Sequence, residues 1–111
     1  FEEEFAKMCG VKYAVATSNG TTAGHLVMIA SDIRPGDEVI TTPFTFFATA
    51  SVIMMAGAKP VFVDVEEDGF CLDPKKVEIA ITDKTKAIQP VHLYGELADM
   101  PSLIEISKKK I

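Results

Sequence analysis

Four short, mostly apolar segments alternate along the chain with segments of helical periodicity, and this alternation constrains the fold most. The expected strands are residues 12–17, 38–42, 60–65 and 86–93. Their mostly continuous apolar character is typical of strands buried on both faces. No two of them are joined by the two-residue turn of a β-hairpin. The pattern therefore predicts an α/β fold with a mainly parallel sheet and helices on both faces.

Capping and turn residues place helices between these strands. Gly10 suits the left-handed position that ends a first helix, and Asp73, followed by proline, is a typical helix start. Further helices are expected over 23–30, over 46–56 and after Asp99. Ligands of such folds bind beyond the carboxyl ends of the strands. The places to search are the segments after Thr17, Thr42, Val65 and Leu93.

Length and charge exclude several classes of function. The 111 residues suffice for one small domain, and a net charge of -5 without a basic stripe argues against nucleic acid as a partner. The uncharged stretch 39–57 contains a proline and several threonines, so no membrane-spanning helix is expected. Lysines 108–110 are interpreted as a solvated helix end. Cys9 and Cys71 have no metal-ligand spacing, which favours free thiols in a cytoplasmic protein and no metal site.

Residues 18–22 form a polar loop between an expected strand and an expected helix. Backbone N–H groups lack partners at a helix N-terminus, and the helix dipole favours an anion there. Gly20 permits close approach of a phosphate, and the hydroxyls of Thr21 and Thr22 add two donors. A plain N-cap formed by Asn19 or the preceding serine explains these residues equally well. An ordinary nucleotide site is disfavoured, because neither a Walker A lysine nor the GxGxxG spacing is present.

Three phenylalanines follow the second expected strand, close to where a ligand would lie. Phe47 continues toward Met54 in the expected helix and is assigned to the core, whereas Phe46 is free to stack on a flat ring. On spacing alone, a core role for all three, Phe44 included, is the favoured alternative. Combined with the polar loop, Phe46 suits a planar heteroaromatic ligand that carries a phosphate.

Seven blocks occur in the order and at the spacing of one enzyme family, and they cover nearly the whole chain. The blocks are residues 2–6, 19–23, 35–40, 44–49, 57–65, 85–88 and 90–95. In them the sequence resembles the N-terminal part of the large domain of the DegT/DnrJ/EryC1/StrS aminotransferases. These are sugar aminotransferases of the aspartate aminotransferase fold that depend on pyridoxal 5'-phosphate (PLP).

The resemblance implies a function and a set of site residues. Asn19, Gly20, Thr21 and Thr22 would hold the cofactor phosphate, and Phe46 would stack on the pyridine ring. The implied reaction moves an amino group from an amino acid to a nucleotide-linked keto sugar in the synthesis of cell-surface polysaccharide or antibiotic sugars. A cytoplasmic homodimer is implied as well.

The family's Schiff-base lysine and its pyridine-nitrogen aspartate come later in the family's sequence than residue 111. Residues 1–111 are therefore expected to be a fragment of the PLP-binding large domain, without catalytic residues and inactive alone. A non-catalytic α/β module that binds a phosphorylated ligand is the alternative. A folded domain without a ligand is the third possibility.

The resembled fold has strand order 3-2-4-5-6-7-1. Residues 38–42, 60–65 and 86–93 are thus expected to pair as strands 2, 3 and 4, while 12–17 stands apart. Such a piece exposes apolar faces and strand edges, which predicts poor solubility.

Several single residues carry expectations of their own. Gly24, where the family usually has leucine, predicts loose packing of its helix. Asp64 resembles a structural position, and His25 is interpreted as a partly exposed helix residue. For His92, near the expected cleft, an active-site role is the less favoured alternative.

Overall fold

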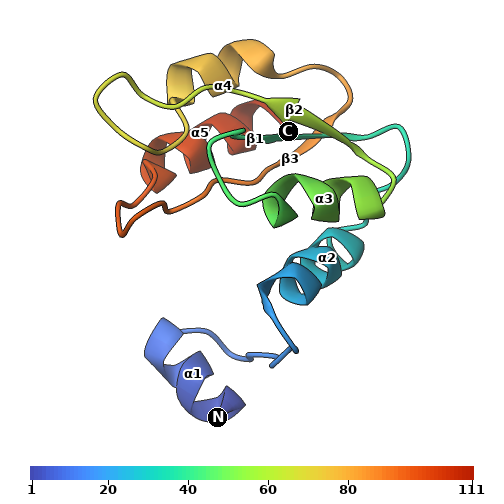
Figure 1. The fold of residues 1–111 in the computed structure, drawn as a ribbon, viewed down its shortest axis with the longest axis vertical. Helices are drawn as coiled ribbons and strands as arrows, with labels where there is room; N and C mark the ends of the chain where they lie inside the picture. The colour runs from blue at the N-terminus through green and yellow to red at the C-terminus, as the bar shows by residue number, and fades with distance from the viewer.

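The computed structural model describes all of residues 1–111, as helices around a small sheet (Figure 1). The elements are α1 (Glu2–Cys9), α2 (Gly20–Ala30), β1 (Glu38–Thr41), α3 (Ala48–Met55), β2 (Lys59–Phe62), α4 (Pro74–Ala80), β3 (Thr85–Ile88) and α5 (Met100–Lys110). The strand order is β2-β1-β3, and both outer strands run parallel to β1. The predicted α/β class and the 3-2-4 order are confirmed.

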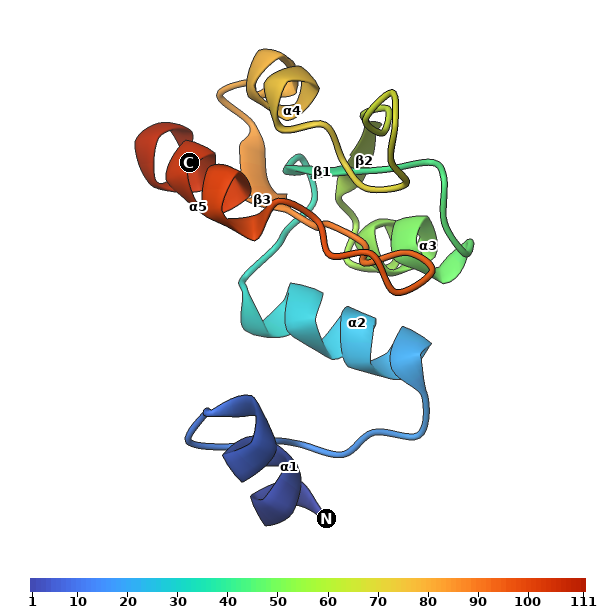
Figure 2. The same cartoon turned by 90° about the vertical axis from the view of Figure 1, so that its left-hand side faces the viewer.

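Helices cover both faces of the sheet, as predicted. Figure 2 shows α4 and α5 on one face and α3, with α2 beyond it, on the other. The two layers follow from β1, because successive side chains of a strand point to opposite faces. Val39 packs with Ile53 of α3, whereas Ile40 packs with Val77 of α4 and Leu103 of α5. All five side chains are buried.

Residues 12–17 form no strand, so that prediction is wrong. No strand of the sheet lies beside them, and an extended segment without a neighbour has no ladder of hydrogen bonds to join. The segment runs from α1 to α2 away from the sheet (Figures 1 and 2). Tyr13 and Val15 are accordingly 75% and 78% exposed. The end of α1 is as predicted, because Gly10 has a φ of 66° in the left-handed region.

The strands end earlier than predicted, whereas β2, β3 and α2 begin one to three residues before their predicted starts. β2 ends at Phe62, and β3 ends at Ile88, shortly before a proline that has no N–H for the ladder. α3 begins at Ala48, after Phe47. Phe47 is 74% exposed, so its assignment to the core is wrong. Because the helix starts only after it, its side chain does not join the helix face that packs on the sheet.

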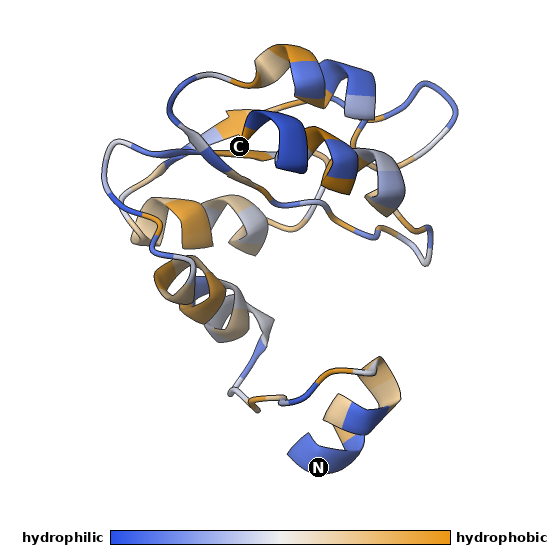
Figure 3. Cartoon of the chain, turned by 180° about the vertical axis from the view of Figure 1, so that it is seen from behind, coloured by the Kyte–Doolittle hydropathy of each residue, from blue (hydrophilic) through white to orange (hydrophobic).

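Helices α2 and α3 are rich in apolar residues, coloured orange in Figure 3, and several of these residues are exposed. Leu26, Val27 and Ile29 of α2 are 46%, 58% and 57% exposed. The predicted exposure of apolar faces is confirmed, and low solubility stays a prediction. No helix combines the length and the apolar content needed to cross a membrane.

Gly24 lies where α2 and α3 pack against each other. A Cβ atom at this position would lie 3.3 Å from Cγ1 of Val52. The helices are therefore closer here than a residue with a side chain would comfortably allow. The expected looseness at Gly24 is wrong, because Val52 of α3 occupies the space beside the glycine.

Candidate functional site

Asn19 organises the loop that precedes α2. Its side-chain Oδ1 accepts hydrogen bonds from the backbone N–H of Thr22 at 2.9 Å and from the Thr22 hydroxyl at 3.2 Å. The Ser18 hydroxyl lies 3.1 Å from the same Thr22 hydroxyl. Asn19 is thus the N-cap of α2, and Thr22 is held inside the capping network.

The cap leaves two donors of the helix free. The backbone N–H groups of Gly20 and Thr21 donate to no atom of the chain. No atom outside the loop lies within 4 Å of the place where a Cβ of Gly20 would be. Both groups stand at the positive end of the helix dipole, where they are available to an anionic acceptor.

A cavity of about 470 Å³ brings this loop together with Phe46, which is 78% exposed. Of the predicted site residues, Asn19, Gly20, Thr21 and Phe46 line the cavity, whereas Thr22 does not. The other lining residues are Gly24, Ala48, Thr49, Val52 and Gln89. Loop and ring, predicted from separate segments, therefore border one volume.

Two polar residues of this cavity were missed by sequence reasoning. Thr49 lies in the first turn of α3, and its hydroxyl is hydrogen-bonded to the hydroxyl of Thr45 at 3.1 Å. Gln89 follows β3 at its carboxyl end. A polar side chain inside the mostly apolar expected strand 86–93 was the available signal for Gln89, but only the folded sheet places it beside the loop.

The cavity contains no ionisable side chain among its nine lining residues. An anion there would be held by backbone N–H groups, hydroxyls and the helix dipole. Neutral donors of this kind bind phosphate at helix N-termini. Elsewhere in the structure, no group of three or more His, Cys, Asp or Glu side chains gathers where it would hold a metal ion.

The other two phenylalanines, Phe44 and Phe47, lie apart from the cavity that Phe46 lines. The Phe44 ring lies 6.1 Å from that of Phe70 and 6.4 Å from that of Tyr94, measured between centroids. Phe44 is 45% exposed, so it belongs to a surface aromatic group and not to the core. Neither Phe44 nor Phe47 lines the cavity.

The two histidines lie outside the cavity. His25 is half-buried within α2, as interpreted from the sequence. Nδ1 of His92 accepts a hydrogen bond from the backbone N–H of Ala98 at 3.1 Å. His92 therefore ties the loop after β3 to the segment just before α5.

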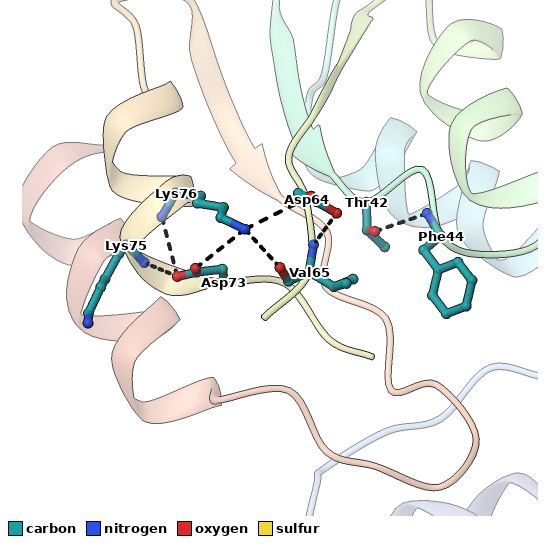
Figure 4. A network of polar contacts seen from close by, with 7 residues as sticks. All are labelled: Thr42, Phe44, Asp64, Val65, Asp73, Lys75 and Lys76. Atoms are coloured by element: carbon teal, nitrogen blue, oxygen red, sulfur yellow. Dashed lines mark hydrogen bonds and ion pairs between the residues drawn. The ribbon is translucent and has the colours of Figure 1, made fainter. Parts of the chain in front are cut away.

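Asp64 belongs to a polar network between β2 and α4 (Figure 4). Its Oδ1 accepts from the backbone N–H of Val65 at 2.9 Å. Nζ of Lys76 donates to the carbonyl of Val65 at 3.0 Å and lies 4.0 Å from Asp64 and 3.8 Å from Asp73, the N-cap of α4. The lysine thus closes the loop between β2 and α4, in agreement with a structural role for Asp64.

The remaining surface predictions also have structural counterparts. Lysines 108–110 form the last turn of α5, where Lys109 pairs with Glu105 and Lys110 lies 3.8 Å from Glu78. They are a solvated helix end, as interpreted. Both cysteines are free, Cys9 exposed and Cys71 buried.

Comparisons with known proteins agree on one family. Residues 1–110 match the model of the DegT/DnrJ/EryC1/StrS aminotransferase family. The chain is 52% identical over 108 residues to the "Pleiotropic regulatory protein" of Geobacillus stearothermophilus, covering 97% of this chain and 29% of the relative. It is 50% identical over 109 residues to GDP-perosamine synthase of Caulobacter vibrioides, covering 98% and 29%.

A solved structure extends the similarity to the fold. NtdA from Bacillus subtilis, crystallised with bound cofactor PMP, matches with a TM-score of 0.95 and 40% identity. The match covers 97% of this chain and 25% of NtdA. The chain therefore spans less than a third of the length of these relatives.

Proposed function

The chain belongs to the DegT/DnrJ/EryC1/StrS aminotransferase family, and on this premise we propose that residues 1–111 are the N-terminal part of the PLP-binding large domain of a longer aminotransferase. The enzyme transfers an amino group from an amino acid to a keto sugar linked to a nucleotide. The observation that carries the proposal is the shared cavity. Unpaired N–H groups of Gly20 and Thr21 and the ring of Phe46 line it together.

These residues fit the chemical parts of PLP. Its phosphate needs several donors, which the N–H groups of Gly20 and Thr21 and the Thr21 hydroxyl provide. Asn19 and Thr22 hold the loop in shape, and the Thr22 hydroxyl is a further candidate donor. Phe46 offers its face to the pyridine ring. When bound, PLP supplies an electron sink for the chemistry of the amino acid.

The proposed share of this chain in catalysis is to seat the cofactor. Lys12, Lys59 and Lys86 do not line the cavity. We propose that the lysine that binds the cofactor covalently, and the aspartate that pairs with the pyridine nitrogen, lie outside residues 1–111. Neither residue has a counterpart in the cavity described above.

The substrate class is supported by the relatives. GDP-perosamine synthase has a nucleotide-linked sugar in its name, and its similarity covers nearly the whole of this chain. We propose the same class of substrate here, in the synthesis of cell-surface polysaccharides or antibiotic sugars. The proposed enzyme is a cytoplasmic homodimer.

The test uses the full-length protein. PLP binding is followed by absorbance, and amino transfer from L-glutamate or L-glutamine to nucleotide-linked keto sugars is followed by mass spectrometry. Binding and transfer are expected in the full-length protein, and no transfer by residues 1–111 alone. Amino transfer by residues 1–111 alone would contradict the proposal that this part of the protein only seats the cofactor. PLP binding without any transfer by the full-length protein supports the non-catalytic module instead.

A further inference from the structure

Gln89 is a polar residue in the layer between the sheet and helices α2 and α3. Side chains alternate along β3, so that Ala87 packs on the core of this face and Ile88 packs on the core of the opposite face. Gln89, one residue after the strand, returns to the side of Ala87 and lines the cavity. Its neighbours on this side of β3 favour an apolar residue. A polar side chain at this position is therefore unexpected from packing alone.

Both backbone polar groups of Gln89 form hydrogen bonds to β1. Its N–H donates to the carbonyl of Ile40 at 2.8 Å, and its carbonyl accepts from the hydroxyl of Thr41 at 2.9 Å. Thr41 is completely buried. These bonds to β1 fix the backbone from which the side chain projects toward α2 and α3.

The side-chain amide of Gln89 has no such partner. Its Oε1 atom is buried and accepts no hydrogen bond. Buried polar groups in folded proteins nearly always have a partner, and an unpaired one lowers stability. The unpaired amide is therefore a cost to the fold that a ligand would remove.

Gln89 lines a cavity that other groups without partners also border. Gly20 and Thr21, whose backbone N–H groups are also unpaired, line the same cavity, as does the ring of Phe46. Two helix donors, one amide and one exposed ring thus border a single volume of about 470 Å³. A ligand with a phosphate, a ring and a polar ring substituent satisfies all of them.

We propose that Gln89 contacts the ligand, its amide forming a hydrogen bond with a polar substituent of the ring that stacks on Phe46. This inference rests on the proposed function, because the ring is that of PLP. An amide carries both a donor and an acceptor, so it pairs with a ring oxygen in either protonation state. Gln89 thus lowers the stability of the ligand-free protein and raises its affinity for PLP.

The test compares Gln89→Met with the wild type in the full-length protein. Methionine is unbranched and of similar length, so it fills the space without the amide. The dissociation constant for PLP is measured by equilibrium dialysis, and the thermal midpoint is measured on PLP-free protein. Affinity is expected to fall about three- to tenfold, the factor for one net hydrogen bond. The midpoint of the PLP-free variant is expected to rise, because the unpaired amide is gone.

Competition experiments identify the part of the ligand that Gln89 contacts. Inorganic phosphate is expected to compete equally well in wild type and Gln89→Met. Pyridoxal, which lacks the phosphate, is expected to bind the variant more weakly by the same factor as PLP. The control Thr21→Val removes a hydroxyl from the loop. It is expected to weaken the binding of phosphate and to leave the binding of pyridoxal unchanged.

Three results overturn the inference. If the wild type binds PLP and Gln89→Met binds it equally well, Gln89 does not contact the ligand. If the variant loses affinity and its PLP-free thermal midpoint also falls, the role of Gln89 is structural. If the wild type binds no PLP, the proposed function fails and this inference fails with it.

Discussion

The polar groups highlighted at the two ends of the sheet differ in whether they have hydrogen-bond partners. At the amino end, the carboxylate of Glu38 is 8% exposed and fully paired. Its Oε1 lies 3.0 Å from Nζ of Lys59, and its Oε2 accepts from the Thr82 hydroxyl at 2.7 Å. At the carboxyl end, the N–H groups of Gly20 and Thr21 and the amide of Gln89 have no partner.

Because of this difference, stability and ligand binding are expected to depend on opposite ends of the sheet. Paired groups at the amino end join β1 to β2 and to the loop before β3, so changes there are expected to affect folding. Unpaired groups at the carboxyl end add nothing to the stability of the fold, so changes there are expected to lower ligand affinity without destabilising the protein. Ligands of parallel sheets bind at the carboxyl end in general. The predictions below test whether the two ends are separable in this way.

The largest expected effect is on stability at the amino end, from Gly57→Ala. Gly57 has a φ of 81°, and a Cβ there would lie 2.8 Å from Cγ of Pro35. Backbone strain and overlap together are expected to cost about 2 to 4 kcal/mol of unfolding free energy. The control is Gly36→Ala, where φ is 98° but no atom lies within 4 Å. Equal losses in thermal or denaturant unfolding would show that the contact with Pro35 contributes nothing.

Phe46→Ala tests the carboxyl end. Loss of the stacking face is expected to weaken PLP binding by the full-length protein about 10- to 100-fold, with little change in the thermal midpoint of the ligand-free protein. Phe47→Ala is the matched control, since Phe47 is equally exposed but does not line the cavity. Similar losses in the two variants would argue against stacking on Phe46.

Asn19 tests whether one residue serves both stability and binding. Asn19→Ala removes the N-cap of α2 and is expected to cost about 1 kcal/mol of unfolding free energy and to weaken PLP binding. Asn19→Asp retains the cap but adds a negative charge beside the phosphate. It is expected to preserve the thermal midpoint and still lower the affinity. A midpoint loss as large as that of the alanine variant would show that the amide itself is needed.

The smallest expected effect is a pH dependence from Glu38. Hydrogen bonds from Thr82 and Lys59 hold the pKa of Glu38 below its ordinary value of 4.5. The pairing therefore stabilises the fold fully above the unfolded-state pKa, and this contribution is lost as the pH falls through the lower, folded-state pKa. Glu38→Gln is expected to be less stable than wild type at pH 7, with the gap narrowing at acidic pH in thermal unfolding. A gap independent of pH would contradict this origin.

Local signals predicted much of the fold. The left-handed Gly10, the capping Asp73 with its proline, and the apolar strands all act through the chain within a few residues. The boundaries were less accurate, because the end of a strand depends on the length of its neighbour. Residues 12–17 have the composition of a strand but lack the neighbour, so they form none.

The candidate site was predicted in part for the same reason. Asn19, Gly20, Thr21 and Phe46 were found from loop chemistry near strand ends, and all four line the cavity. Phe47 was misplaced, because its direction depends on the residue at which α3 begins. Gln89 was missed, because nothing in its own segment distinguishes an amide that faces a loop 70 positions earlier from one that faces water.

The sequence by itself determined the class of the fold, the capping of its helices and the chemical types at the strand ends, because these depend on short-range geometry and on the alternation of apolar residues. Only the tertiary structure decided that residues 12–17 join no strand, how closely α2 and α3 approach at Gly24, and which polar groups keep no partner. Pairing and burial are relations between distant segments, so no single segment reveals which polar groups the folded chain leaves without a protein partner.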